Sequence, residues 1–181
     1  EGPAVTGQLG PDEDAAKALA VPDLARGRVP VSLAAIAAEK AQIADKPLLA
    51  GVIGPFSLAG RLMDVSEILY ACVDEPETVH LVVEKAAQFV TSYIQALREA
   101  GADGVVMAEP LAGVLSPAMM EEFSCGAVQA VISAVQRADF PVVYHNCGRL
   151  APAAYPMLAD LGAAAYHFGN AIQMADALAA M

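Results

Sequence analysis

Short apolar runs that end at glycine or proline recur along this chain and alternate with helical patterns. The two clearest runs, residues 48–53 and 104–108, stop at Gly54-Pro55 and just before Glu109-Pro110. Continuous apolar runs of this length are typical of strands that are buried on both faces of a sheet. We predict further strands over residues 4–7, 141–144 and 163–167.

Helical patterns separate the predicted strands. The clearest begins at Asp74, a predicted N-cap, has Pro76 in its first turn and stops at Gly101. Ser116 is predicted to cap another helix, over residues 117–134, and the acidic cluster at residues 12–14 is predicted to cap a third. The remaining predicted helices cover residues 31–44, 57–72, 152–161 and 172–180.

Strands that alternate with helices predict an α/β fold with a parallel sheet and right-handed crossovers. No glycine-rich dinucleotide fingerprint or phosphate-binding loop follows any predicted strand, which disfavours a doubly wound nucleotide-binding sheet. A complete barrel of eight strand–helix units usually needs about 250 residues, whereas this chain has 181. We therefore predict a partial (β/α)8 barrel that forms one domain over residues 1–181, in a truncated chain.

Composition restricts the partners. The formal net charge is −11 and the ten basic residues form no stripe, so we expect neither nucleic-acid nor membrane-surface binding. No segment has the pattern of a membrane span or a signal peptide. Three cysteines form no disulfide framework, which favours a reducing, cytoplasmic location.

The tetrapeptide from His145 to Gly148 carries the most chemical information. In an extended chain, His145 and Cys147 project from the same face because alternate residues do. One imidazole and one thiol that converge at the end of a strand are ligands suited to Zn²⁺. Zinc can hold a thiol as thiolate at neutral pH, so the pair predicts group transfer to sulfur.

Two further side chains end neighbouring predicted strands. Glu109 ends the preceding strand and is predicted to act at the same mouth as a proton acceptor, a ligand or a partner of a ligand. His167 ends the following strand and is the best candidate within this chain for an additional zinc ligand, although a core histidine bonded to backbone is an alternative. Cys72 and Cys125 fit better as buried, small apolar residues.

Four segments in this order resemble the uroporphyrinogen decarboxylase superfamily. They are Gly54 to Gly60, Gly101 to Gly104 with the strand ending at Glu109-Pro110, Leu115 to Phe123, and His145 to Gly148. The chain is most similar to the corrinoid-dependent methyltransferases of that superfamily. The resemblance implies a barrel with the site at the carboxyl ends of its strands. It also implies that His145 and Cys147 are zinc ligands, with a third ligand from a later cysteine.

The resemblance implies a zinc-dependent methyltransferase that moves a methyl group from a methylcorrinoid to a thiol. Its partners would be a corrinoid protein or free methylcobamide and a small thiol, with Gly54, Pro55 and Met107 near the corrinoid. One alternative is a metal-free decarboxylase that acts on a tetrapyrrole. Another is a non-catalytic fragment that needs a partner, such as a homodimer, because part of a barrel leaves sheet edges open.

Overall fold

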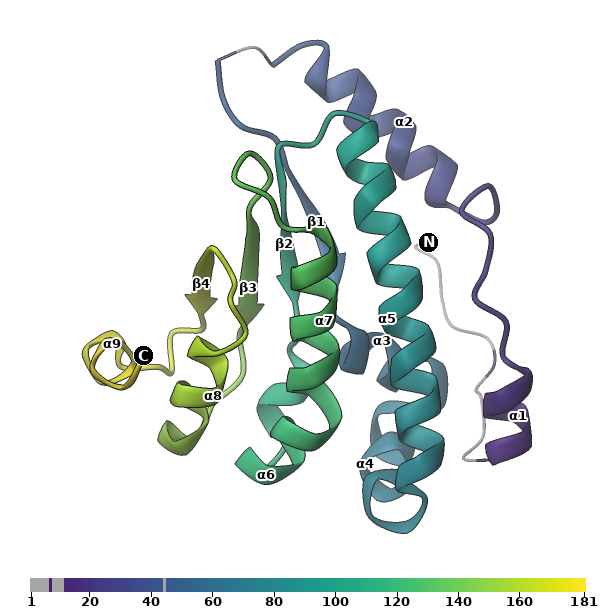
Figure 1. The fold of residues 1–181 in the computed structure, drawn as a ribbon, viewed down its shortest axis with the longest axis vertical. Helices are drawn as coiled ribbons and strands as arrows, with labels where there is room; N and C mark the ends of the chain where they lie inside the picture. Colours follow the sequence, from purple (N-terminus) through teal and green to yellow (C-terminus); the bar gives the residue numbers. More distant parts are fainter. Residues whose placement is uncertain (1–6, 8–11, 44) are drawn as a thin grey trace.

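The computed structural model describes residues 7, 12–43 and 45–181, and its centre is a parallel sheet of four strands (Figure 1). The strands are β1 (Leu49–Ile53), β2 (Gly104–Ala108), β3 (Val142–Asn146) and β4 (Ala165–Phe168). All four correspond to predicted strands, but β3 continues two residues beyond its predicted end, through His145 and Asn146. The predicted strand at residues 4–7 lies largely outside the described residues, and Gly7 is not in a strand.

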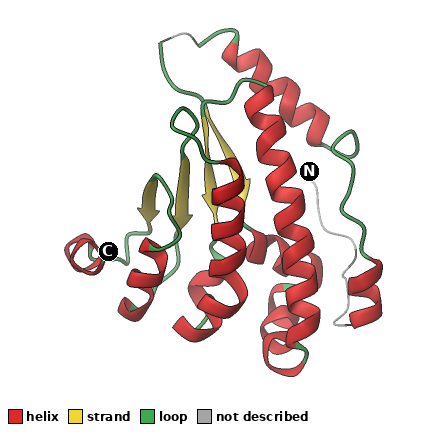
Figure 2. Cartoon of the chain, in the orientation of Figure 1, coloured by secondary structure: helices red, strands yellow, loops and turns green. Residues whose placement is uncertain are grey.

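Helices and short helical turns connect the strands (Figure 2). They are α1 (Glu13–Ala18), α2 (Val29–Lys40), α3 (Pro55–Met63), α4 (Val65–Asp74), α5 (Pro76–Glu99), η1 (Leu111–Val114), α6 (Pro117–Met120), η2 (Glu121–Cys125), α7 (Gly126–Val135), η3 (Pro152–Ala154), α8 (Tyr155–Ala159) and α9 (Met174–Ala180).

The strands follow one another across the sheet in sequence order, β1-β2-β3-β4, and every neighbouring pair is parallel. Helices α5, α7 and α8 lie along the same face of this sheet (Figure 1). A doubly wound sheet reverses its strand order and carries helices on both faces, whereas a barrel keeps one order and one helical side. The described chain therefore forms an open arc of the kind that a (β/α) barrel contains.

The two faces of the sheet differ in burial. On the helix-covered face, Val105, Met107 and Val142 have no exposed surface. On the other face, which we call the open face, Val106 and Val143 are only half-buried. Successive side chains of a strand alternate between the faces, so one strand supplies both the packed core and the open surface.

Helix α5 provides most of the covering layer. Val79, Val82, Val90 and Ile94 form its buried stripe, with exposures of 1% or less. Their spacing is the helical period that the sequence predicts. The predicted cap is wrong, however, because Asp74 is the last residue of α4 and no side chain caps α5.

Two other predicted helices are interrupted. The helix expected at residues 57–72 is divided at Asp64, which has a positive φ of 80° and caps α4 by accepting a hydrogen bond from Ser66 N. The helix that begins after Ser116 contains a π-helical turn, η2. Ser116 does cap α6, and Asp12 caps α1, as the sequence predicts. Within the described part of the chain, no helix has the length and apolarity that a membrane crossing requires.

Candidate functional site

The carboxyl ends of the four strands meet along one edge of the sheet. This edge contains Gly54 after β1, Glu109 after β2, the segment from His145 to Gly148, and His167 in β4. The strand alternation divides these residues between the faces, because His145 and His167 follow the open-face row whereas Glu109 and Asn146 follow the covered row. Parallel strands thus bring residues from distant parts of the sequence to one place.

His145 and His167 are register partners on β3 and β4. Their rings stack with centroids 4.6 Å apart and an interplanar angle of 26°. His145 Nδ1 lies 2.9 Å from the backbone oxygen of His167. A carbonyl oxygen only accepts hydrogen bonds, so Nδ1 carries the proton and, in the neutral ring, Nε2 carries the free lone pair. This is the arrangement typical of a histidine that ligates a metal through Nε2.

Cys147 follows β3 directly, and its side chain is exposed. The loop around it is closely packed. Gly169 N donates to the backbone oxygen of Asn146 at 3.1 Å, and a Cβ at Gly169 would lie 2.6 Å from the backbone oxygen of Cys147. Cys72 is buried and Cys125 partly buried, and burial raises the pKa of both thiols to about 11, whereas Cys147 is exposed.

Glu109 is placed differently from the prediction. Its side chain is fully buried, and its carboxylate accepts hydrogen bonds from Phe56 N at 3.1 Å and Ser57 N at 2.6 Å in the first turn of α3. Burial raises the pKa of Glu109 to about 7, against these hydrogen bonds, which lower it. The carboxyl therefore joins β2 to α3, and it does not face the open mouth where a substrate would bind.

The three residues predicted near the corrinoid are also buried. Met107 has no exposed surface, because the strand alternation directs it into the core under the helices. Gly54 and Pro55 are buried where α3 begins, and a Cβ at Gly54 would overlap the Glu109 carboxylate. In this structure none of the three offers a surface on the open face, and their contact with a corrinoid stays a prediction.

The predicted three-ligand zinc set is not assembled either. Within residues 12–43 and 45–181, no three His, Cys, Asp or Glu side chains form a group that could hold a metal ion. The near-parallel stack explains why His167 does not join His145, since the lone pairs of stacked rings point along separate planes. His145 and Cys147 remain as two potential ligands of the right chemical type for zinc.

Asn146 is the site residue that the sequence reasoning overlooked. Its side chain is fully buried, donates to the backbone oxygen of Glu109 at 2.7 Å and accepts from Gly148 N at 2.8 Å. Its position between His145 and Cys147 was visible, and alternation could have predicted that it faces the opposite way.

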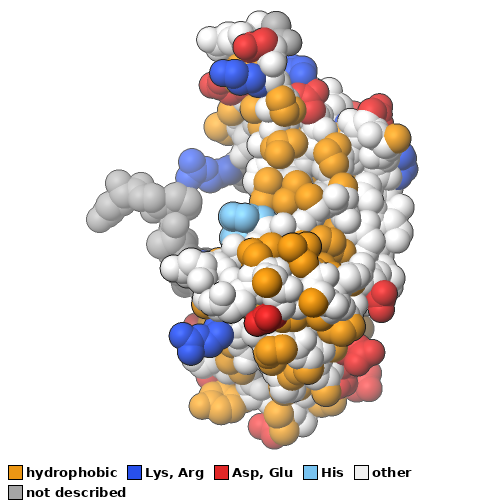
Figure 3. Space-filling view, turned by 90° about the vertical axis from the view of Figure 1, so that its left-hand side faces the viewer, with side chains coloured by type: hydrophobic (Ala, Val, Ile, Leu, Met, Phe, Trp, Pro, Cys, Tyr) orange, Lys and Arg blue, Asp and Glu red, His pale blue; other side chains and the backbone are white. Residues whose placement is uncertain are grey.

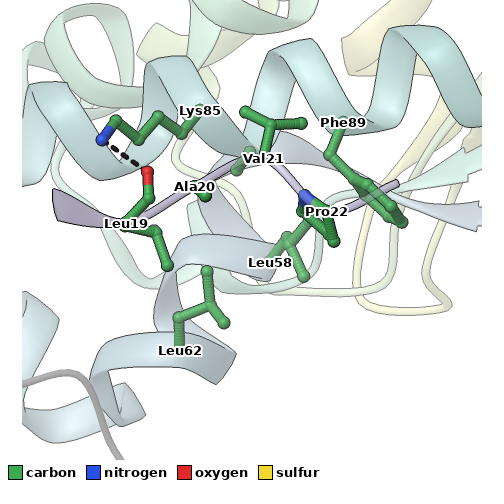
Figure 4. Close-up of a pocket in the computed structure, with 9 residues that line it drawn as sticks. Leu19, Ala20, Val21, Pro22, Leu58, Leu62, Lys85 and Phe89 are labelled. Carbon is green, nitrogen blue, oxygen red and sulfur yellow. Dashed lines mark hydrogen bonds between the residues drawn. The ribbon is translucent and has the colours of Figure 1, made fainter. Parts of the chain in front are cut away.

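A separate groove lies away from these residues (Figure 4). It has a volume of about 430 Å³ between the segment Leu19 to Pro22 and helices α3 and α5. Lys85 closes one end, where its Nζ donates to the backbone oxygens of Ala16, Lys17 and Leu19. None of the predicted site residues lines it.

Comparisons with known proteins show which family the chain resembles. A family model described as "Uroporphyrinogen decarboxylase (URO-D)" matches residues 1–181. The chain is 28% identical over 130 residues to the methylcobamide:CoM methyltransferase MtaA of Methanosarcina barkeri, which covers 70% of this chain and 38% of that protein. It is 30% identical over 141 residues to the uroporphyrinogen decarboxylase of Desulfotalea psychrophila, which covers 74% of this chain and 40% of that protein.

A solved structure agrees with the sequence matches. A methyltransferase from Methanosarcina mazei superposes with a TM-score of 0.82 at 29% identity, over 92% of this chain and 49% of that protein. The described arc therefore corresponds to about half of that methyltransferase, which confirms the predicted partial barrel. The chain spans about two fifths of the length of the two curated relatives.

Proposed function

Because the chain belongs to the uroporphyrinogen decarboxylase family, we propose that it acts in methyl transfer from a methylcorrinoid to a thiol, with zinc as cofactor. Its similarity to two methyltransferases supports this choice within the family. The observation that carries the proposal is the hydrogen bond from His145 Nδ1 to the His167 backbone oxygen. It leaves Nε2 as the free ring nitrogen two residues before the exposed thiol of Cys147.

In this proposal His145 and Cys147 supply two zinc ligands, and the third ligand comes from outside the described residues. Zinc bound there would lower the pKa of a thiol in its open coordination position, which favours the nucleophilic thiolate. The His167 carbonyl holds the His145 ring in one tautomer and one orientation. Glu109 has a structural role beneath the site, because its buried carboxylate joins the end of β2 to the first turn of α3.

The open face suits a large, flat and largely apolar donor. Val106 and Val143 lie half-buried in the same row as His145. In Figure 3, histidine side chains lie beside hydrophobic ones near one margin of the molecule. A methylcorrinoid, free or carried by a corrinoid protein, would pack on this face, and a small thiol would accept the methyl group beside Cys147.

The test measures zinc content and methyl transfer from methylcobalamin to a small thiol in the full-length protein. His145→Ala and Cys147→Ala should each lose most of the zinc and about 100-fold or more in transfer rate, because loss of a ligand's outer partner alone costs roughly 10–100-fold. His80→Ala and Cys125→Ala are matched controls that remove an imidazole and a thiol elsewhere, and they should retain both properties. Equal zinc in all five proteins would refute the proposal.

A metal-free decarboxylase acting on a tetrapyrrole is the second candidate. It is favoured by the 30% identity to a uroporphyrinogen decarboxylase. The two functions are distinguished by porphyrinogen turnover in the presence of a chelator. Turnover that survives both chelation and Cys147→Ala would favour the decarboxylase.

A further inference from the structure

Asn146 makes contacts on both sides of the exposed cysteine. Its Oδ1 accepts a hydrogen bond from Gly148 N at 2.8 Å, so the bond closes a tight loop around Cys147. Its backbone oxygen accepts from Gly169 N at 3.1 Å, which ties the same loop to the end of β4. The residues before and after Cys147 are therefore both held through Asn146.

The same side chain anchors this loop to β2. Asn146 Nδ2 donates to the backbone oxygen of Glu109 at 2.7 Å, and the Glu109 carboxylate in turn accepts hydrogen bonds from the first turn of α3. The chain of contacts runs from α3 through Glu109 and Asn146 to the loop of Cys147. The Glu109 and Asn146 side chains are both fully buried, which strengthens the bonds that they make to each other's strand and to α3.

Glycines pack closely around the Asn146 side chain. A Cβ at Gly113 would lie 2.6 Å from Asn146 Oδ1, and a Cβ at Gly148 would lie 2.9 Å from the same atom. Gly113 and Gly148 also lie close together, since a Cβ on either would be 3.1 Å from the Cα of the other. Backbone from η1 thus lies directly against the Asn146 amide.

We propose that Asn146 is the positioning residue for Cys147, and that its amide fixes the loop from which the thiol reaches the metal. The role requires one side chain that donates to Glu109 O and accepts from Gly148 N at once, as the two ends of the Asn146 amide do. An aspartate in its place accepts but does not donate, and an alanine does neither. The inference rests on the proposed function, in which Cys147 is a zinc ligand.

The experiment compares Asn146→Ala and Asn146→Asp with wild type in the full-length protein. Gln129→Ala is the matched control, because Gln129 Nε2 also donates to a backbone oxygen, that of Asp160 at 2.9 Å, on the exposed side of α7. The first measurement is hydrogen exchange in the peptide that contains Gly148. The second is titration with Co²⁺, followed by the absorption band of a cobalt–thiolate bond.

We expect faster exchange at Gly148 in Asn146→Ala and at least tenfold weaker Co²⁺ binding, the usual range for partners of metal ligands. Asn146→Asp, which keeps the acceptor for Gly148, should lie between Asn146→Ala and wild type, and Gln129→Ala should match wild type. Unchanged Gly148 exchange in both Asn146 variants overturns the positioning role. Faster exchange with unchanged Co²⁺ affinity also overturns it, because the thiol then needs no fixed loop.

Failure of the proposed function has a different signature. If wild type and Cys147→Ala give the same Co²⁺ spectrum, Cys147 is not a ligand and the zinc proposal fails, while the exchange measurement still decides whether Asn146 fixes the loop. If Asn146→Ala does not fold, Asn146→Asp alone decides the question. It supports the inference if its Co²⁺ affinity falls while its thermal unfolding matches that of Gln129→Ala.

Discussion

Successive residues of β3 alternate between two faces of the sheet, and the two faces differ in how deeply their side chains are buried. Tyr144 and Asn146 on the covered face are at most 1% exposed, whereas Val143 and His145 on the open face are half-buried. The same division applies to the end of β2, where Glu109 is fully buried. The chemistry that we propose belongs to the open row, and the residues that hold it in place belong to the covered row.

This difference shows how a sheet can support a reactive edge. Side chains in the open row are only partly covered and can meet a ligand, and His145 is held there by its bond to the His167 backbone oxygen. The covered row is packed by helices, so its polar groups must be fully hydrogen-bonded, and Glu109 and Asn146 are. The tightly packed residues of the covered row thereby hold the strand in place, and with it the less packed residues of the open row.

The largest expected effect is a pH dependence of stability caused by Glu109. Its pKa is about 7 in the folded chain and 4.5 when unperturbed, so the folded state binds more protons between these values. The stability contribution is complete below about pH 4.5 and is lost as the pH rises through 7, amounting to about 3 kcal/mol. Glu109→Gln, which cannot ionise and keeps one of the two hydrogen-bond acceptors for α3, should remove this loss.

Urea unfolding at pH 5 and pH 8 measures the effect as the difference between wild type and variant. Glu99→Gln is the matched control, because Glu99 is exposed near the end of α5, and it should leave the pH dependence unchanged. If wild type and Glu109→Gln lost equal stability between the two pH values, burial of Glu109 would not be the cause of the pH dependence.

A second expected effect separates adjacent valines of β3. Val142→Ala removes a side chain with no exposed surface and leaves a cavity under the helices, which should cost about 2 kcal/mol. Val143→Ala removes a half-buried side chain from the open face and should cost less than about 1 kcal/mol. Chemical denaturation of both variants measures the difference. Equal costs would indicate that the open face is packed in solution.

His167→Ala should have a smaller effect on folding. It removes the ring that stacks on His145, and a ring pair of this kind contributes about 1 kcal/mol or less. The variant retains the backbone oxygen that accepts from His145 Nδ1, so the tautomer of His145 is preserved. Thermal unfolding and a Co²⁺ titration should both stay close to wild type. A complete loss of Co²⁺ binding would restore His167 as a ligand.

The smallest effect is expected at Gly51 in the middle of β1. No atom lies within 4 Å of a Cβ built there on the open face. Gly51→Ala should change the free energy of unfolding by less than about 1 kcal/mol, and toward greater stability, because alanine loses less backbone entropy on folding. Thermal unfolding provides the measurement. A clear destabilisation would show that other groups occupy the open face.

Much of the fold was predictable because it depends on local patterns. The apolar runs that form β1 and β2, the buried stripe of α5, and the caps at Ser116 and Asp12 are properties of short segments. The prediction missed the division of α3 from α4 at Asp64, although aspartate is a residue type that caps helices.

The candidate site was predictable in part. The His145–Cys147 spacing identified the reactive edge, but the local pattern could not show that Glu109, Met107 and Gly54 are buried. Their burial depends on contacts with residues about 40 to 55 positions away, such as the bonds from Phe56 and Ser57 to Glu109. Asn146 was overlooked for the same reason, because its partner at Glu109 lies 37 residues earlier.

The sequence by itself determined that this chain alternates strands with helices, and that an imidazole and a thiol lie two residues apart where β3 ends. These features follow from periodicity and from the conformational preferences of neighbouring residues. Only the tertiary structure decided which neighbours of that pair are open and which are buried. The physical reason is that burial and hydrogen bonding between parallel strands join residues far apart in the chain, and the local sequence does not contain those contacts.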